Sequence, residues 1–211
     1  MTRILLISGS TRDDSLHTAA LRTAARSAPA GITASRYDGL RDLPPFVPAD
    51  EAPTPGPVRF LRFQVGGADA VVFCTPQYAG SLPGSLKNLL DWLIGSGSLN
   101  GKPAAWLSVA APGQDDGARA ALETVLTHCG ARLFRPACIR VPLTPDAIDA
   151  RGIIGDMQLR TALLDVLQAL ARAAVPPVPP EQPSWQAYSS VFPVVMRQRP
   201  RAHDPWYHQG S

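Results

Sequence analysis

One stretch of the sequence decides the fold: Pro76-Gln77-Tyr78-Ala79-Gly80-Ser81-Leu82-Pro83-Gly84-Ser85-Leu86-Lys87-Asn88-Leu89-Leu90-Asp91-Trp92-Leu93. The residues before it, 70–75, form a short apolar run rich in β-preferring side chains, which predicts a buried strand of a parallel sheet. Pro76 ends that strand because it has no N–H to donate. From Pro83 the leucines recur at helical spacing. Open α/β sheets bind ligands at such strand–loop–helix junctions, beyond the carboxyl ends of the strands.

Length and composition indicate one ordinary domain with an appendage. The chain has 211 residues, of which 45% are hydrophobic and 18% charged, enough to bury a core. No apolar run approaches the roughly 18 residues of a membrane-spanning helix. The first residues lead directly into a predicted strand and lack the features of a signal peptide. We therefore expect a cytoplasmic protein that has no membrane segment.

Charge and cysteine content argue against two other classes of protein. The net charge is only +3, and its 18 arginines and two lysines are scattered rather than grouped. This pattern gives no support to a nucleic-acid partner. The three cysteines, Cys74, Cys129 and Cys138, form no CxxC pair and have no nearby histidine that would complete a zinc site. We expect reduced core thiols and no bound metal.

Apolar periodicity predicts strands that alternate with helices along the first 174 residues. We expect strands at 3–8, 32–37, 70–75 and 104–109, a fifth strand within 131–141, and helices at 16–27, 58–65, 83–93, 118–129 and 157–174. The proline-rich segment 38–56 is predicted to be a surface loop. Five strands alternating with helices of this length indicate a parallel sheet covered by helices on both faces.

The last part of the chain has a different character. Residues 175–211 contain eight prolines, which argue against a further helix, and five aromatic residues, which argue against a solvated linker. We therefore divide the chain into a domain at 1–174 and an irregular C-terminal arm at 175–211. Our hypothesis is that the aromatic residues pack this arm across a neighbouring subunit: Trp185, Tyr188, Phe192, Trp206 and Tyr207.

A candidate anion site follows the first strand. Residues 9–15, Gly-Ser-Thr-Arg-Asp-Asp-Ser, lie between a strand and a helix, where free backbone N–H groups and the helix dipole converge. Ser10 and Ser15 add hydroxyls, and Arg12 adds a guanidinium suited to phosphate. The spacing fits neither GxxxxGK[ST] nor GxGxxG. The structural alternative is a capped helix, with Ser15 as the N-cap and Arg12 in solvent.

The two loops together resemble the NAD(P)H-dependent FMN reductase family, which includes quinone, azo-dye and chromate reductases. Gly9-Ser10-x-Arg12-x-x-Ser15-x-His17 resembles the family signature GSxRxxSxN. The stretch from Pro76 to Trp92 resembles its second signature, PEYNxSxPGxLKNxxDW. The second match is long and specific, and the resemblance covers about residues 3–174.

The resemblance implies a flavodoxin-like, doubly wound, five-stranded parallel sheet of order 2-1-3-4-5, with FMN at the switch point between strands 1 and 3. It implies hydride transfer from NADPH or NADH to FMN, and then to a quinone-like or other small-molecule electron acceptor. It also implies a homodimer or homotetramer. By position, the FMN phosphate would be held by Ser10, Arg12, Ser15 and His17, and the isoalloxazine ring would be lined by Pro76, Gln77, Tyr78, Ala79 and Gly80, with Gly113 in a third loop.

Three departures from the family pattern affect this site. His17 and Ala79 each replace an asparagine, and Asp115 and Asp116 occupy a loop that is usually rich in glycine. Imidazole can still donate to phosphate and binds it better when protonated. Two carboxylates near the flavin would disfavour its anionic reduced form. The alternative, favoured by how rarely aspartate is buried, is that both face solvent.

Other interpretations stay open at this point. A flavodoxin-type electron carrier, or an interaction protein without flavin, would share the same scaffold. Tyr78 and Trp92 are either shaping residues or core and interface aromatics. The family pattern places residues 88–92 at a subunit contact, whereas Lys87 and Asp91 also have the i, i+4 spacing of a surface ion pair.

Overall fold

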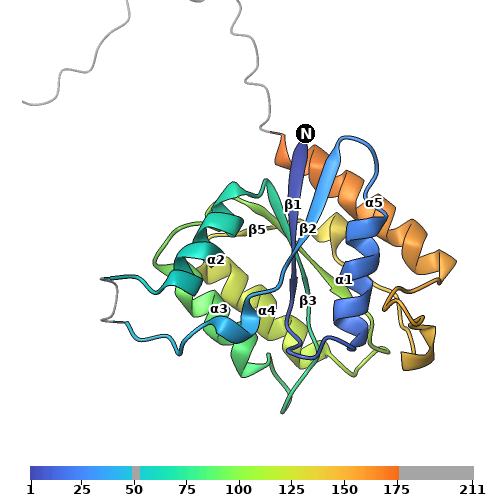
Figure 1. Cartoon of the computed structure of the whole chain (residues 1–211), viewed down its shortest axis with the longest axis horizontal. Helices are drawn as coiled ribbons and strands as arrows, with labels where there is room; N and C mark the ends of the chain where they lie inside the picture. The colour runs from blue at the N-terminus through green and yellow to red at the C-terminus, as the bar shows by residue number, and fades with distance from the viewer. Residues whose placement is uncertain (49–52, 176–211) are drawn as a thin grey trace, which may run out of the picture. The chain divides into compact units, whose positions relative to one another are not determined.

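A parallel sheet forms the centre of the protein (Figure 1), seen in a computed structural model that describes residues 1–48 and 53–175. The strand order is β2-β1-β3-β4-β5, and a further short strand, β6, also pairs with β4. The strands are β1 (Thr2–Ser8), β2 (Ile32–Tyr37), β3 (Ala70–Cys74), β4 (Pro103–Ser108), β5 (Arg132–Leu133) and β6 (Ile139–Arg140). The predicted doubly wound α/β fold and its strand order are confirmed.

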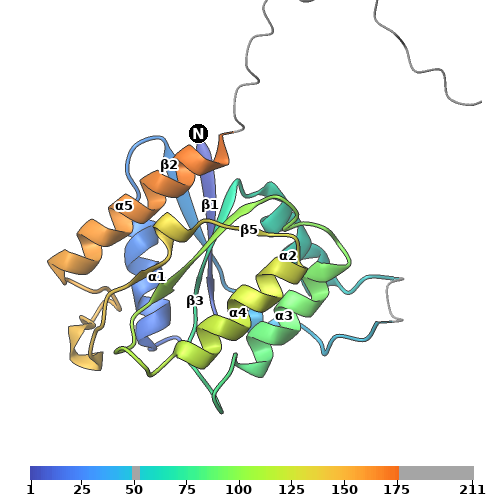
Figure 2. The ribbon, with the colours of Figure 1, turned by 180° about the vertical axis from the view of Figure 1, so that it is seen from behind.

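Helices cover both faces of the sheet (Figures 1 and 2). They are α1 (Leu16–Arg26), α2 (Gly56–Gly67), α3 (Gly84–Ile94), α4 (Asp116–His128) and α5 (Met157–Ala174). Successive side chains of a strand point to opposite faces, so β1 contributes to two cores. Ile4 and Leu6 pack with α1 and α5, whereas Leu5 and Ile7 pack with α2, α3 and α4. This burial on both faces explains why the central strands are uninterrupted apolar runs.

Residues 131–141 hold the fifth strand, as predicted, but the segment also contains a further short strand, β6. Between β5 and β6 the chain makes a single 3-10 turn over Arg135–Ala137. Pro136 lies in this turn and has no N–H to donate to β4, so a continuous ladder cannot form there. The chain then rejoins the sheet, where Val141 N–H donates to the carbonyl of Ser108 at 2.8 Å. The interruption leaves Arg140 beside the carboxyl end of β4.

Helix α3 holds part of the proline-rich loop. The amide of Asn88 donates to the carbonyl of Pro44 at 3.0 Å and accepts from Phe46 N–H at 2.7 Å. The indole of Trp92 also donates to the Pro44 carbonyl, at 2.9 Å, and its ring meets Phe46 edge to face. Trp92 is therefore a core aromatic, the structural alternative considered above. The subunit contact of residues 88–92 stays a prediction.

Lys87 and Asp91 form the i, i+4 ion pair on α3, with 2.6 Å between Nζ and Oδ1. Cys74 and Cys129 are buried and Cys138 is half-buried, and all three are free thiols, as expected. Within the described ranges, no helix is both long enough and apolar enough to span a bilayer. Beyond Val175, the predicted arm lies outside the described residues. The hypothesis about its packing therefore stays a prediction.

Candidate functional site

Three loops meet at the carboxyl edge of the sheet, after β1, β3 and β4. Gly9, the first residue after β1, donates its N–H to the carbonyl of Cys74 at 2.9 Å. A β-carbon on Gly9 would collide with the side chain of Thr75. Glycine is therefore required where the β1 and β3 loops approach each other. This contact sets the first two loops side by side at the predicted switch point.

The loop after β1 is built as an anion site at the start of α1. Ser15 caps the helix: its Oγ accepts from Thr18 N–H at 3.1 Å and donates to Thr18 Oγ1 at 2.9 Å. Ser10 is buried, and its Oγ accepts from Arg12 N–H at 3.1 Å. The N–H groups of Leu16 and His17 have no acceptor in the described part of the chain. Capping and anion binding are thus compatible, because the cap uses only one of the free N–H groups.

The Arg12 guanidinium is paired with a carboxylate of its own loop. Its side chain is exposed and forms a two-pronged ion pair with Asp14, at 3.1 Å from Nε to Oδ1 and from Nη2 to Oδ2. The hydrogen bond from Arg12 lowers the pKa of Asp14. The solvated position considered from the sequence is therefore the one that the structure records. An anion that binds at this loop has to compete with Asp14 for the guanidinium.

His17 lies on α1, at the start of the helix behind the loop, and is partly buried. Burial lowers its pKa to about 4, while the carboxylate of Asp115 acts in the opposite direction. The imidazole is consequently neutral at pH 7. A neutral imidazole still carries one N–H donor. A bound anion would raise this pKa, and would in this way favour the protonated imidazole, which binds phosphate better.

The loop after β3 contains a tight turn over residues 78–81. Tyr78 and Ser81 exchange two backbone hydrogen bonds, of 3.0 and 2.9 Å. The two central residues, Ala79 and Gly80, both have positive φ, of 48° and 75°. Tyr78 is 50% exposed, so it belongs to the surface of the loop and not to the core. The asparagine of the family pattern suits position 79 because asparagine tolerates this conformation better than alanine.

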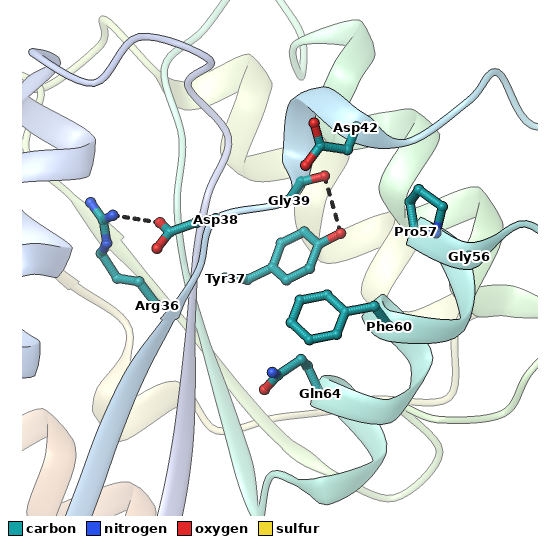
Figure 3. A pocket seen from close by; sticks show the side chains of 9 residues that line it. All are labelled: Arg36, Tyr37, Asp38, Gly39, Asp42, Gly56, Pro57, Phe60 and Gln64. Carbon is teal, nitrogen blue, oxygen red and sulfur yellow. Dashed lines mark hydrogen bonds and ion pairs between the residues drawn. The ribbon is translucent and has the colours of Figure 1, made fainter.

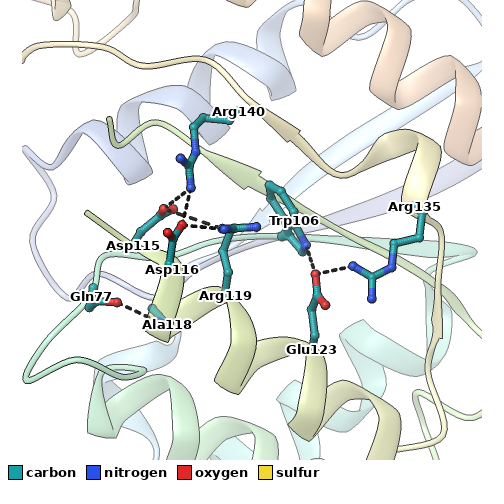
Figure 4. Close-up of polar contacts among 9 residues, drawn as sticks. All are labelled: Gln77, Trp106, Asp115, Asp116, Ala118, Arg119, Glu123, Arg135 and Arg140. Carbon is teal, nitrogen blue, oxygen red and sulfur yellow. Dashed lines mark hydrogen bonds and ion pairs between the residues drawn. The ribbon is translucent and has the colours of Figure 1, made fainter. Parts of the chain in front are cut away.

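The same loop rests on the first turn of α4. The side-chain carbonyl of Gln77 accepts a hydrogen bond from Ala118 N–H at 2.9 Å (Figure 4). A β-carbon on Gly117 would collide with the carbonyl oxygen of Gly80. Sequence reasoning missed Gly117, which it placed in the loop before the helix predicted at 118–129, whereas α4 begins at Asp116 and includes Gly117 in its first turn.

The third loop leads from β4 to α4. Gly113, with φ 86°, forms a turn in which Gln114 N–H donates to the carbonyl of Ala111 at 3.1 Å. The expectation that Asp115 and Asp116 both face solvent is right for Asp116 and wrong for Asp115, which is 3% exposed. Asp115 is buried because Arg140 returns to the sheet beside it after the interruption at Pro136, and pairs with it at 2.6 Å.

A large cavity lies between α1, the third loop and the segment after β6. Its volume is about 660 Å³. His17 lines one side, Ala110, Ala111 and Gln114 line another, and Pro142 and Leu143 close it. The lining is largely apolar with a few polar groups, as is usual for small-molecule sites. The predicted phosphate residue His17 and the third loop therefore share one cavity.

A second cavity, of about 560 Å³, lies beyond β2 and against α2 (Figure 3). Tyr37 and Phe60 face each other there with ring centroids 6.3 Å apart, and the Tyr37 hydroxyl donates to the carbonyl of Gly39 at 3.2 Å. Burial raises the pKa of Tyr37 to about 12. No residue of the predicted FMN site lines this cavity.

Comparison with known proteins gives a consistent result. The family described as NADPH-dependent FMN reductase matches residues 2–142. An NAD(P)H-dependent FMN reductase of Pseudomonas aeruginosa is 33% identical over 173 residues, which cover 80% of this chain and 92% of that protein. A quinone reductase of Escherichia coli is 36% identical over 106 residues, which cover 48% of this chain and 56% of that protein.

Solved structures agree with this. A flavoenzyme NAD(P)H:(acceptor) oxidoreductase from Paracoccus denitrificans superposes with a TM-score of 0.70 at 27% identity, covering 82% of this chain and 97% of that one. A WrbA-like flavodoxin from Agrobacterium tumefaciens superposes with a TM-score of 0.52 at 15% identity, covering 82% of this chain and 98% of that one, and it supports the flavodoxin-like fold alone.

Proposed function

Because the chain belongs to the NADPH-dependent FMN reductase family, we propose that it is an NAD(P)H-dependent FMN oxidoreductase that reduces a quinone-like or other small acceptor. The observation that carries this proposal is the meeting of three loops at the carboxyl edge of the sheet, fixed by the bond between Gly9 and Cys74 and by the bond between Gln77 and Ala118. In a parallel α/β sheet this edge is where a cofactor binds.

The residues of the first loop fit the phosphate of FMN. Leu16 and His17 offer free N–H groups at the positive end of the α1 dipole. Ser10 shapes the loop from inside, and Arg12 lies within the same loop with an exposed guanidinium that can exchange Asp14 for phosphate. We assign phosphate binding to Ser10, Arg12, Ser15 and His17, with Ser15 acting mainly as the helix cap.

The residues of the other two loops fit a flat ring. The turn 78–81 presents backbone groups and the exposed ring of Tyr78, and Gly113 forms a turn in the third loop. We assign the isoalloxazine contacts to Pro76, Gln77, Tyr78, Ala79, Gly80 and Gly113. When bound, FMN supplies the redox chemistry, accepting hydride from the nicotinamide and passing electrons to the acceptor. The chain binds and orients the reactants, and we name no catalytic acid or base.

The test is direct. The protein is titrated with FMN, and the loaded protein is mixed anaerobically with NADH or NADPH while the flavin absorbance is followed. Bleaching by either nucleotide, and reoxidation by a quinone with parallel double-reciprocal lines, is the expected result. Binding of FMN without bleaching would favour a flavodoxin-type carrier, and absence of FMN binding would favour an interaction protein. The cytoplasmic location and the homodimer or homotetramer stay predictions.

A further inference from the structure

Asp115 is the only charged side chain that is buried in the described part of the chain. It stands at the N-cap position of α4, yet its carboxylate makes no capping hydrogen bond to the helix. A buried carboxylate costs free energy unless it is paired and hydrogen-bonded. The structure supplies the pair from a distant part of the sequence: Arg140 Nη2 lies 2.6 Å from Asp115 Oδ1.

The pair belongs to a cluster of two acids and two arginines (Figure 4). Arg140 also contacts Asp116 at 2.9 Å, and Arg119 contacts Asp116 at 2.6 Å and Asp115 at 3.7 Å. The Arg119 guanidinium lies over the ring of Trp106, 4.8 Å from its centroid, which restricts its movement. The four charges cancel, so the third loop carries two carboxylates without a net negative charge.

This cluster borders the loops that we assign to FMN. Asp115 is followed within three residues by Gly117 and Ala118, which touch the loop of Gln77 and Gly80. Its field also reaches the start of α1 and the end of β3. Burial is the main cause of the lowered pKa of His17 and of the raised pKa of Cys74, and in both the Asp115 carboxylate pushes the pKa upward.

We propose that Asp115 and Arg140 are positioning residues that act as a charge-compensated pair: Asp115 ties the end of the third loop to Arg140 of β6, and Arg140 cancels its charge, so that bound FMN is reduced beside a neutral cluster. This inference rests on the proposed FMN site. It explains how this chain places acids in a loop where the family pattern has glycines, because Asp116 is matched by Arg119 of the same helix and Asp115 by Arg140, a distant residue that the sequence pattern does not reveal.

The proposal predicts shifts of opposite sign. Above neutral pH the reduced flavin carries a negative charge that the oxidised ring lacks. Replacing Arg140 by Met leaves the cluster with two carboxylates and one guanidinium, and this net negative charge disfavours the reduced form and lowers the midpoint potential of bound FMN. Asp115→Asn leaves the cluster with one carboxylate and two guanidinium groups, and this net positive charge raises that potential. A purely structural role would instead weaken both forms and give no opposed shifts.

The experiment uses the full chain loaded with FMN at about pH 8. The midpoint potential and the Kd for oxidised FMN are measured for wild type, Asp115→Asn, Arg140→Met and the double variant. We expect the ratio of the affinities for reduced and oxidised FMN to change by about fivefold or more in opposite directions in the single variants, and to return close to the wild-type value in the double variant. Arg135→Met is the matched control. Arg135 also pairs with an acid of α4, Glu123, at 2.7 Å, but its side chain is exposed.

Shifts of the same sign, or no shifts while FMN still binds, would overturn the inference and leave the proposed function intact. A wild-type protein that binds no FMN would overturn both. If Arg140→Met does not fold, the isosteric Asp115→Asn and the charge-preserving Arg140→Lys decide the question. The electrostatic role requires that Asp115→Asn raises the midpoint potential of bound FMN and that Arg140→Lys leaves it near the wild-type value.

Discussion

Gln77 and Ala118, 41 residues apart, are joined by a hydrogen bond of 2.9 Å from the Ala118 N–H to the side-chain carbonyl of Gln77. The bond ties the loop after β3 to the first turn of α4. It forms only because the neighbouring position, Gly117, has no β-carbon to strike the carbonyl of Gly80. An unpaired N–H of the helix start is thereby satisfied by the loop that we assign to the flavin ring.

Gly117→Ala is therefore expected to separate α4 from this loop. Because the obstruction is backbone rather than a flexible side chain, we expect a loss of about 1–3 kcal/mol in the free energy of unfolding, and weaker FMN binding. Urea unfolding and FMN titration measure the two effects. Gly84→Ala is the control: it lies in the first turn of α3, and a β-carbon there would meet nothing within 4 Å. Equal behaviour of the two variants would contradict the close approach.

The turn 78–81 predicts the direction in which two substitutions change thermal stability. Ala79 has a φ of 48°, a conformation that costs an alanine about 1 kcal/mol relative to glycine. Ala79→Gly, and to a lesser degree Ala79→Asn, should therefore raise the midpoint of thermal unfolding. Gly80→Ala is the matched opposite: its φ is 75° and its β-carbon would stand in open space, so the loss reports backbone strain alone. If Gly80→Ala raised the midpoint of thermal unfolding as Ala79→Gly does, this account of the turn would be refuted.

Much of the fold follows from local pattern. The run at 70–75, the leucines of α3 and the alternation of strands and helices specify a parallel sheet, because each pattern needs only neighbouring residues. The anion loop was predictable for the same reason, since Ser15 and the start of α1 are adjacent. Pro136 could also have been used: a proline in the middle of an apparent strand indicates an interruption.

The electrostatics of the site could not be predicted in the same way. Asp115 and Arg140 are 25 residues apart, and they meet only because the chain leaves the sheet at Pro136 and returns at β6. No periodicity in the sequence specifies that register. Aspartate is rarely buried in proteins, which is why we expected both carboxylates to face solvent. This expectation was wrong for Asp115 and right for the next residue, Asp116.

Arg12 gives a prediction about binding. Arg12→Ala removes a charged phosphate contact and should weaken FMN binding by roughly 10- to 100-fold. Asp14→Asn has the opposite expected effect, because Arg12 is then free of its competing carboxylate; we expect binding to tighten by about two- to fivefold. FMN fluorescence titration measures both, with Arg135→Ala as a remote control. Unchanged affinity in Arg12→Ala would remove Arg12 from the site.

His17 makes the stability of the FMN-free protein depend on pH. Its pKa falls from about 6.5 in the unfolded chain to about 4 in the folded one, chiefly through burial. Between these values the unfolded state binds a proton that the folded state does not, so stability is full above about pH 6.5 and is lost as the pH falls toward 4. The shift corresponds to a loss of up to about 3 kcal/mol.

His17→Asn, which restores the residue of the family pattern, should remove this component. The measurement is urea unfolding without FMN at about pH 7 and about pH 5. Wild type should lose about 2 kcal/mol more than the variant over this interval. His128→Asn, at an exposed histidine in the last turn of α4, should behave as wild type does. Added FMN should narrow the difference between wild type and the His17→Asn variant, because a phosphate beside the imidazole raises its pKa and favours the protonated form. Identical pH dependence in wild type and His17→Asn would show that the imidazole is not held in its neutral form by the fold.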